Sequence, residues 1–143
     1  MQIISAHGGV DPIHPGHIKY IEESLKLVGP KDKFIFILTR DDQLEEKNRQ
    51  NGFPKKRPPI PYEARKTVLE WGLKGRGEVV PNLDDDITIT KSLLHYRPTI
   101  MTQGGDRAPG NIVEEEVRVC EEIGCKVIYG VGGTNKRYSS RNM

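Results

Sequence analysis

The stretch Gly8-Gly9-Val10-Asp11-Pro12-Ile13-His14-Pro15-Gly16-His17 decides the fold, because it joins two different hydrophobic patterns. Residues 1–6 precede it as a short apolar run, which predicts a strand. After it, apolar residues recur at steps of three and four, namely Ile18, Ile21, Leu25 and Val28. That spacing is typical of a helix with one buried face. The stretch is therefore predicted to be a strand-to-helix turn, with residues 29–32 ending the helix.

The residue types in this turn favour a phosphate ligand. Gly8 and Gly9 allow the backbone to approach a ligand closely. The helix start presents N–H groups and the positive end of the helix dipole, and both attract an anion. His14 and His17 are three residues apart near the first helical turn, so their rings are expected to face the same side. Two imidazoles placed there can stabilise negative charge that develops on a phosphate.

The rest of the chain predicts a doubly wound α/β domain. Four further strands are indicated by apolar runs at residues 34–38, 77–81, 99–102 and 126–129. We expect a five-stranded parallel sheet with helices on both faces, formed as a single domain by residues 1–143. The turns that follow the strands then share one rim, where folds of this kind bind their ligands.

Two segments between the strands carry specific expectations. Residues 43–61 are polar and basic and hold four prolines, which predicts a loop. Pro61 stands just before a second predicted helix. The apolar face of that helix is expected to consist of Ala64, Val68 and either Leu69 or Trp71.

A run of three carboxylates, Asp84, Asp85 and Asp86, invites a metal site. Contiguous carboxylates cannot all face one ion, so the run is expected to be a solvated loop. Within it, Asp86 is expected to cap the next helix.

The composition excludes several classes of protein. Charged residues make up 29% and hydrophobic residues 35% of 143 residues, as in an ordinary globular domain. The net charge of +2 is too small to indicate nucleic-acid binding. No apolar stretch approaches the length of a membrane span, and a cytoplasmic protein is expected. Cys120 and Cys125 fit neither a zinc nor a redox pattern, which predicts reduced, structural thiols.

The turn resembles the HxGH signature of the cytidylyltransferase-like nucleotidyltransferases. Their usual lead-in is Gly-x-Phe-Asp-Pro-x-His, and here Val10 stands in place of Phe, which removes no catalytic group. The resemblance implies that His14 and His17 are catalytic and bind the α- and β-phosphates of a nucleoside triphosphate. It implies nucleotide binding by the small residues of the turn, which are Gly8, Gly9, Val10 and Gly16.

The resemblance extends to the basic segment and the second helix. The catalytic, phosphate-binding lysine of the family corresponds to Lys47, with Lys55 or Lys56 as alternatives because the segment is longer than usual. Residues 57–69 resemble the pattern Arg-Pro-x-x-Pro-x-x-Glu-Arg-x-x-Val-Leu, with one residue separating the Glu from the Arg. Acceptor binding is implied for Asp11, Asp41 and Arg65.

Two later motifs complete the resemblance. Gly104-Gly105-Asp106 resembles the Gly-Gly-Asp of the heptose-1-phosphate adenylyltransferases and follows the fourth predicted strand. Its glycines permit close backbone contact, and its carboxylate can accept hydrogen bonds from a ribose. Near the end of the chain, the resemblance implies that Lys136 or Arg137, together with Ser139 and Ser140, binds the β- and γ-phosphates. The two motifs together imply a set of nucleotide-binding residues, namely Gly104, Gly105, Asp106, Lys136, Arg137, Ser139 and Ser140.

The implied reaction is nucleotidyl transfer with release of pyrophosphate and with Mg²⁺ bridging the phosphates. The first expectation is transfer of AMP from ATP to a phosphorylated sugar. The alternative is a cytidylyltransferase that uses CTP and glycerol 3-phosphate or a similar alcohol phosphate. A third hypothesis is a protein that binds nucleotides without turnover. The expected partners are the triphosphate and a small phosphorylated acceptor, and a homodimer is expected from the family.

Overall fold

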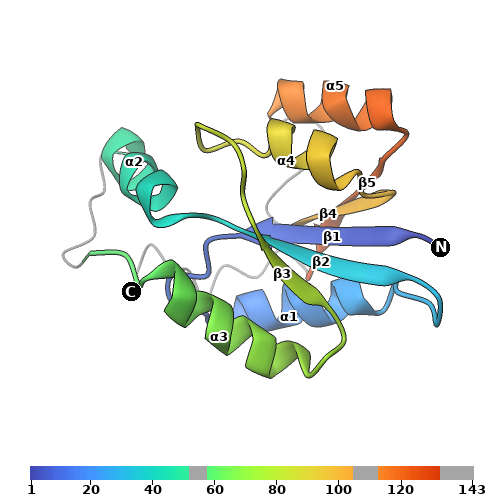
Figure 1. The fold of residues 1–143 in the computed structure, drawn as a ribbon, viewed down its shortest axis with the longest axis horizontal. Helices are drawn as coiled ribbons and strands as arrows, with labels where there is room; N and C mark the ends of the chain where they lie inside the picture. The colour runs from blue at the N-terminus through green and yellow to red at the C-terminus, as the bar shows by residue number, and fades with distance from the viewer. Residues whose placement is uncertain (52–57, 105–112, 133–143) are drawn as a thin grey trace.

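The five strands form one parallel sheet in the order β3-β2-β1-β4-β5 (Figure 1). The structure is a computed structural model and describes residues 1–51, 58–104 and 113–132. The strands are β1 (Ile3–Gly8), β2 (Lys33–Leu38), β3 (Glu78–Pro81), β4 (Ile100–Gly104) and β5 (Lys126–Val131). The predicted doubly wound α/β fold is confirmed, and each strand lies within a few residues of its predicted place.

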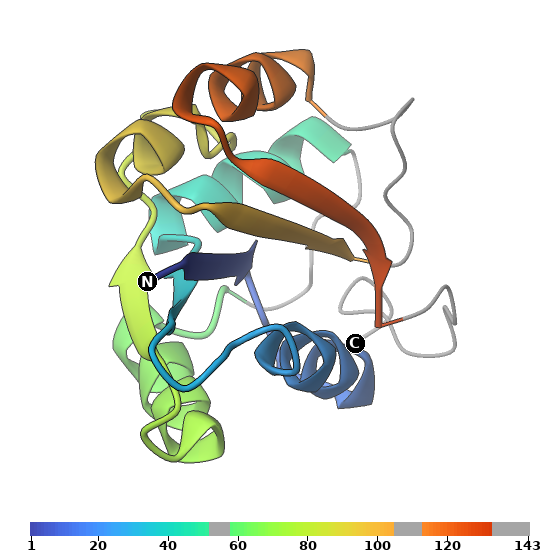
Figure 2. The same cartoon turned by 90° about the vertical axis from the view of Figure 1, so that its right-hand side faces the viewer.

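The helices cover both faces of the sheet. They are α1 (Pro15–Leu25), α2 (Asp41–Asn51), α3 (Tyr62–Leu73), α4 (Thr90–Tyr96) and α5 (Glu114–Ile123). Helices α1 and α3 pack on one face and α4 and α5 on the other, whereas α2 lies beyond the carboxyl end of β2 (Figures 1 and 2). None of these helices is long and apolar enough to cross a membrane within the part of the chain that the structure describes.

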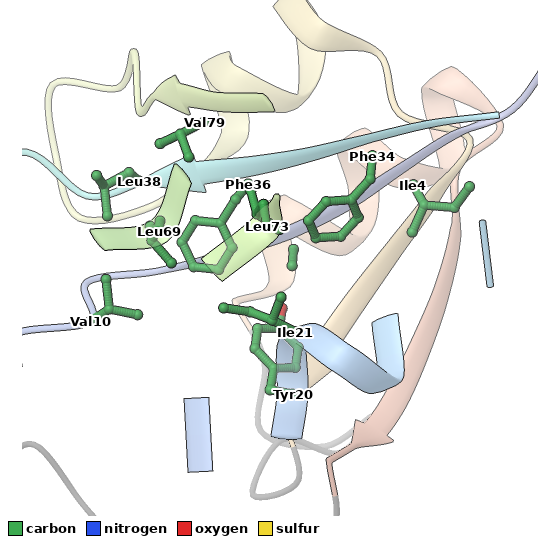
Figure 3. Packing of buried hydrophobic residues seen from close by; sticks show 11 residues of the cluster. Ile4, Val10, Tyr20, Ile21, Phe34, Phe36, Leu38, Leu69, Leu73 and Val79 are labelled. Atoms are coloured by element: carbon green, nitrogen blue, oxygen red, sulfur yellow. The ribbon is translucent and has the colours of Figure 1, made fainter. Parts of the chain in front are cut away.

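Each face of the sheet has its own core. Phe34, Phe36 and Leu38 of β2 point to the first face, where they meet Tyr20 and Ile21 of α1 together with residues of α3 (Figure 3). Strand residues alternate between faces, so Ile35 and Ile37 pack on the opposite core with Leu93 of α4 and Cys120 of α5. Strand β2 reads as a continuous apolar run because both of its faces are covered.

The two cysteines lie in the second core as free, buried thiols. A hydrogen bond with Cys120, together with burial, holds the pKa of the Cys125 thiol above its usual value. The thiol therefore stays protonated at neutral pH, which agrees with the structural role predicted for it.

The strand order reverses between β1 and β4. From β1 the chain proceeds to β2 and β3 on one side, and it then crosses over to β4 and β5 on the other. Ligands of doubly wound folds bind beyond the carboxyl ends of the strands at such a switch point. The turn that follows β1 and the last residue of β4, Gly104, both lie at this position.

The buried faces of α1 and α3 differ from the prediction. Ile18 is 51% exposed, and the residues of α1 that are buried are Tyr20, Ile21 and Ser24. Helix α1 ends at Leu25, and Val28 packs on the core from the following turn. In α3 the exposed residues include Ala64, Val68 and Trp71, and the buried row is Arg65, Leu69 and Leu73. The predictions of Ile21, Leu25, Val28 and Leu69 as core-facing residues are confirmed, whereas those of Ile18, Ala64 and Val68 are wrong, because polar side chains occupy buried positions on both helices.

Residues 43–61 do not form the single loop that was predicted, because α2 extends to Asn51. Two buried residues hold this polar helix in place. Leu44 packs close to the turn, such that a Cβ added to Gly9 would lie 2.8 Å from Leu44 Cδ2. Gln43 is 2% exposed and bonds to the backbone of neighbouring segments.

The prediction that Asp86 caps the next helix is wrong. The carboxylate of Asp84 accepts hydrogen bonds from the backbone N–H groups of Lys91 at 2.8 Å and Ser92 at 2.9 Å, in the first turn of α4. Asp84 is 2% exposed, so this part of the loop is not solvated. Asp86 instead accepts hydrogen bonds from the hydroxyl and the backbone N–H of Thr88. These two bonds lower the pKa of the Asp86 carboxyl.

The packing of α3 predicts a contrast between neighbouring leucine and tryptophan positions. Leu69→Ala removes a side chain that is 2% exposed and is expected to lower the free energy of unfolding by about 2–5 kcal/mol. Trp71→Ala removes a larger side chain that is 77% exposed and is expected to change it by less than about 0.5 kcal/mol. Urea unfolding of both variants measures the difference, and an equal loss in both would contradict the described face of α3.

Candidate active site

His14 and His17 form the start of α1. His14 is the N-cap residue, and its Nδ1 accepts a hydrogen bond from the backbone N–H of Gly16 at 3.1 Å. The Nδ1 of His17 accepts from the backbone N–H of His14 at 3.2 Å. Each ring thus replaces the hydroxyl or carboxylate that usually caps a helix. Pro15 stands at the first helical position, where its missing N–H costs nothing.

The capping bonds define the proton positions of the two rings. A neutral imidazole that accepts at Nδ1 carries its proton on Nε2, so we infer the Nε2–H form for both residues. The rings stack with their centroids 3.7 Å apart and an angle of 24° between their planes. Two stacked imidazole rings therefore stand side by side at the positive end of a helix dipole, an arrangement that suits an anion with several oxygens.

The turn before the histidines is tightly packed. Gly8 ends β1, and Gly9 follows it in close contact with Leu44. Val10 is 4% exposed and belongs to the first core, although its φ of 43° is a left-handed value that a β-branched residue rarely adopts. Its burial against the core holds the backbone in this conformation. Asp11, which is 2% exposed, accepts a hydrogen bond from the backbone N–H of Ile60 at 2.9 Å through Oδ1.

Arg65 of α3 joins this turn to three other segments. Its side chain is 1% exposed. Its Nη1 donates to the backbone carbonyls of Gly9 at 2.9 Å and Thr39 at 2.7 Å, and its Nε donates to that of Ile60 at 2.7 Å. Its Nη2 donates to Asp41 Oδ1 at 2.6 Å at the start of α2. Arg65 and Asp41 thus support the rim through protein contacts, and their predicted contact with an acceptor stays a prediction.

The remaining predicted site residues divide between described and other parts of the chain. Lys47 is an exposed residue of α2, and Gly104 ends β4 next to a register shift in its pairing with β5. Outside the described residues lie Gly105, Asp106, Lys136, Arg137, Ser139 and Ser140, together with Lys55 and Lys56. The described residues thus place the histidine pair, the glycine turn, Asp11, Asp41 and Arg65 on one rim, with α2 beside them.

Sequence analysis missed a second set of contacts on this rim. Arg40 Nη1 donates to the carbonyls of Asn82 at 2.7 Å and Asp84 at 2.8 Å, and its guanidinium lowers the pKa of the Asp42 carboxyl through a direct hydrogen bond. Gln43 accepts from the backbone N–H of Arg40 and donates to the carbonyl of Asp84. Gln43 follows Arg40 by three residues, as the glutamine of a capping box follows its N-cap residue, but Arg40 is not a usual N-cap residue, so the sequence holds only half of this signal.

The fold and the paired histidines define an α/β protein with a glycine turn and helix start of the HxGH type at the switch point of its sheet. The family model described as cytidylyltransferase-like matches residues 6–134. The chain therefore belongs to the cytidylyltransferase-like family, and the family predicted from the sequence is confirmed.

The known proteins that are similar to this chain have several different names. The chain is 35% identical over 116 residues, 80% of its length, to the FAD synthase of Archaeoglobus profundus. It is 30% identical over 122 residues, 85% of its length, to the bifunctional protein HldE of Actinobacillus pleuropneumoniae. The match spans 66% of that FAD synthase and 22% of HldE. A lipopolysaccharide core biosynthesis protein from Thermoplasma volcanium has a similar structure, with a TM-score of 0.70, 25% identity and coverage of 94% of this chain and 99% of that one.

The contacts of Arg65 predict that it is needed for stability. In Arg65→Lys one ammonium replaces a guanidinium that serves four segments, and we expect the free energy of unfolding to fall by about 3 kcal/mol. Arg76→Lys is the matched control, because Arg76 pairs with Glu22 at the surface and its loss is expected to cost less than about 1 kcal/mol. Chemical unfolding compares the two variants, and similar values for both would show that Arg65 does not hold the rim together.

Proposed function

We propose that this protein transfers AMP from ATP to the phosphate of a small phosphorylated acceptor and releases pyrophosphate. The observation that carries the proposal is the stacked pair of His14 and His17, whose Nδ1 atoms accept the backbone hydrogen bonds that cap α1. The pair lies at the switch point of the sheet, where doubly wound folds bind nucleotides.

The proposed reaction is an in-line displacement at the α-phosphorus. An oxygen of the acceptor phosphate forms a bond to that phosphorus, the bond to the β-phosphate oxygen breaks, and pyrophosphate leaves with the electron pair. His14 and His17 donate hydrogen bonds to the α- and β-phosphates as negative charge develops on them. The N–H groups at the start of α1 add positive potential, and Lys47 neutralises the transferring phosphate. No covalent intermediate with the protein is required.

Mg²⁺ is proposed to enter with the triphosphate. Such ions take several ligands from phosphates and water and need only one or two protein carboxylates. No group of three or more metal-binding side chains gathers in the parts of the chain that the structure describes. The ion would supply charge neutralisation on the β- and γ-phosphates, and the histidine pair would act on the transferring group.

Two acceptors are supported by specific observations. A sugar phosphate is favoured by the Gly104-Gly105-Asp106 stretch, which resembles the heptose-1-phosphate adenylyltransferases, and by the similarity to a lipopolysaccharide core biosynthesis protein. FMN is favoured by the 35% identity to a FAD synthase, since FAD consists of FMN joined to AMP. Both acceptors take AMP from ATP, so ATP is preferred over CTP as the donor.

Loss of one catalytic imidazole is expected to abolish most of the turnover. His17→Ala removes a donor to the phosphates, and we expect kcat to fall at least about 100-fold, while circular dichroism shows a retained fold. The control is His95→Ala, because His95 is an exposed residue of α4 on the opposite face of the sheet, and this variant is expected to keep full activity. Unchanged kcat in His17→Ala would remove the basis of the proposed mechanism.

A pyrophosphate-release assay separates the candidate functions. The protein is incubated with Mg²⁺, one of ATP, CTP, GTP or UTP, and one of three acceptor classes: sugar 1-phosphates, FMN or glycerol 3-phosphate. Release with ATP and a sugar 1-phosphate supports the first acceptor, and release with ATP and FMN supports the second. Release with CTP and glycerol 3-phosphate alone contradicts the proposal in favour of a cytidylyltransferase. Nucleotide binding without release in any combination supports a catalytically silent protein.

A further inference from the structure

Strand β1 pairs very differently with its two neighbours. Its pairing with β2 runs without interruption from Ile3 opposite Lys33 to Gly8 opposite Leu38. Its pairing with β4 consists of Ile4 opposite Ile100 and Ser5 opposite Met101, and it stops there. The two strands therefore separate just before the turn that carries the histidine pair.

The hydroxyl of Tyr20 stands where the next bond between these strands belongs. The carbonyls of Gln2, just before β1, and of Gly8, its last residue, point to the β2 side. Because the backbone groups of successive strand residues point to opposite sides, those of the odd-numbered residues of β1 point to β4. Continuing the register, the N–H of His7 would donate to the carbonyl of Thr102. Instead, the His7 N–H donates to Tyr20 Oη at 3.2 Å, and Tyr20 Oη donates to the Thr102 carbonyl at 2.8 Å. One side chain thus replaces a direct bond of the ladder.

A buried network fixes this hydroxyl, because Thr102 Oγ1 lies within hydrogen-bond distance of Tyr20 Oη at 3.2 Å. Ser24 Oγ donates to the carbonyl of Tyr20 at 2.8 Å and lies 2.9 Å from Thr102 Oγ1, and Ser24 and Thr102 are both fully buried. Burial raises the pKa of Tyr20 to about 12, so the phenol keeps its proton and donates at neutral pH. Gly132, the residue after β5, also lies close to Tyr20, since a Cβ added to Gly132 would lie 3.0 Å from Tyr20 Cα.

The position of Tyr20 couples the helix to both strands of the switch point. Tyr20 follows His17 by three residues on α1, so its bonds to β1 and β4 also fix the helix that carries the histidine pair. Strand β1 ends at Gly8 and β4 ends at Gly104, so the spacing of these two strands sets the distance between the segments that follow them at the switch point.

We propose that Tyr20 is a positioning residue whose hydroxyl, inserted between β1 and β4, sets the width of the crevice in which the nucleotide binds. For the identity of the ligand this inference rests on the proposed function. The separation of the strands is a property of the protein alone.

The direct test is Tyr20→Phe, which removes the hydroxyl and keeps the ring in the core. The His7 N–H and the Thr102 carbonyl then lose their shared partner and are expected to close to a direct bond of about 2.9 Å. A crystal structure of the variant without nucleotide measures this distance. A separation that stays at the wild-type value, with water in place of the hydroxyl, would overturn the proposal.

The second arm measures the consequence for the ligand. With Mg²⁺-ATP, we expect the KM of Tyr20→Phe to rise at least about tenfold while kcat at saturation changes less than about threefold, because the phenol touches no reacting atom. Ser24→Ala is the matched control: it removes a neighbouring buried hydroxyl of the same helix and leaves both strand bonds of Tyr20 in place. Its KM is expected to stay within about twofold of wild type.

The outcomes separate this proposal from the proposed function. Equal increases of KM in Tyr20→Phe and Ser24→Ala would mean that the effect is a general loss of packing, and the proposal would fail. The same conclusion follows if the KM of Tyr20→Phe equals that of wild type. If the wild-type protein binds no nucleotide, the proposed function fails, whereas the crystal structure of Tyr20→Phe still decides whether the hydroxyl keeps the strands apart.

Discussion

The guanidinium of Arg65 is the interaction on which the rim of the sheet depends. It lies almost completely buried near the start of α3 and bonds to four different segments of the chain. These segments are the glycine turn, the end of β2, the start of α2 and the chain that enters α3. A buried charge is tolerated only when its donors are satisfied, so the four segments must keep their relative positions. The histidine pair is placed on this frame, because the turn that leads into α1 is one of the segments that Arg65 holds.

The parts of the fold that follow from simple periodicity were predictable. The strand at residues 34–38 is a continuous apolar run, and the turn around Gly8 and Gly9 separates a strand pattern from a helix pattern, so the sheet and the position of the site could be derived. The HxGH stretch further identified the family, since paired imidazoles at a helix start after a glycine turn are a specific combination.

The parts that were not predictable depend on buried polar side chains. An arginine occupies a core position on α3, and a tyrosine and a serine do so on α1, so the apolar pattern misplaced part of the buried face of both helices. A glutamine occupies a buried position on α2, and the polar sequence of that helix led to the prediction of a loop. Similarly, Asp84 rather than Asp86 caps α4, since the loop brings back a carboxylate six residues before the helix. Local propensity cannot identify such groups, because their partners come from distant segments.

Most of the bonds that hold the rim run from a side chain to a main-chain carbonyl. Arg65 bonds to three carbonyls, and Arg40 and Gln43 bond to two each, with the carbonyl of Asp84 shared between them. A carbonyl is supplied by every amino acid, so these bonds do not depend on the side chains of the residues that accept them, even where another contact, such as that of Gly9 with Leu44, restricts the residue. Three long polar side chains thus leave the loops around the crevice open to sequence divergence. A frame of this kind allows a family to keep the same turn and helix start while the sequences of its loops diverge.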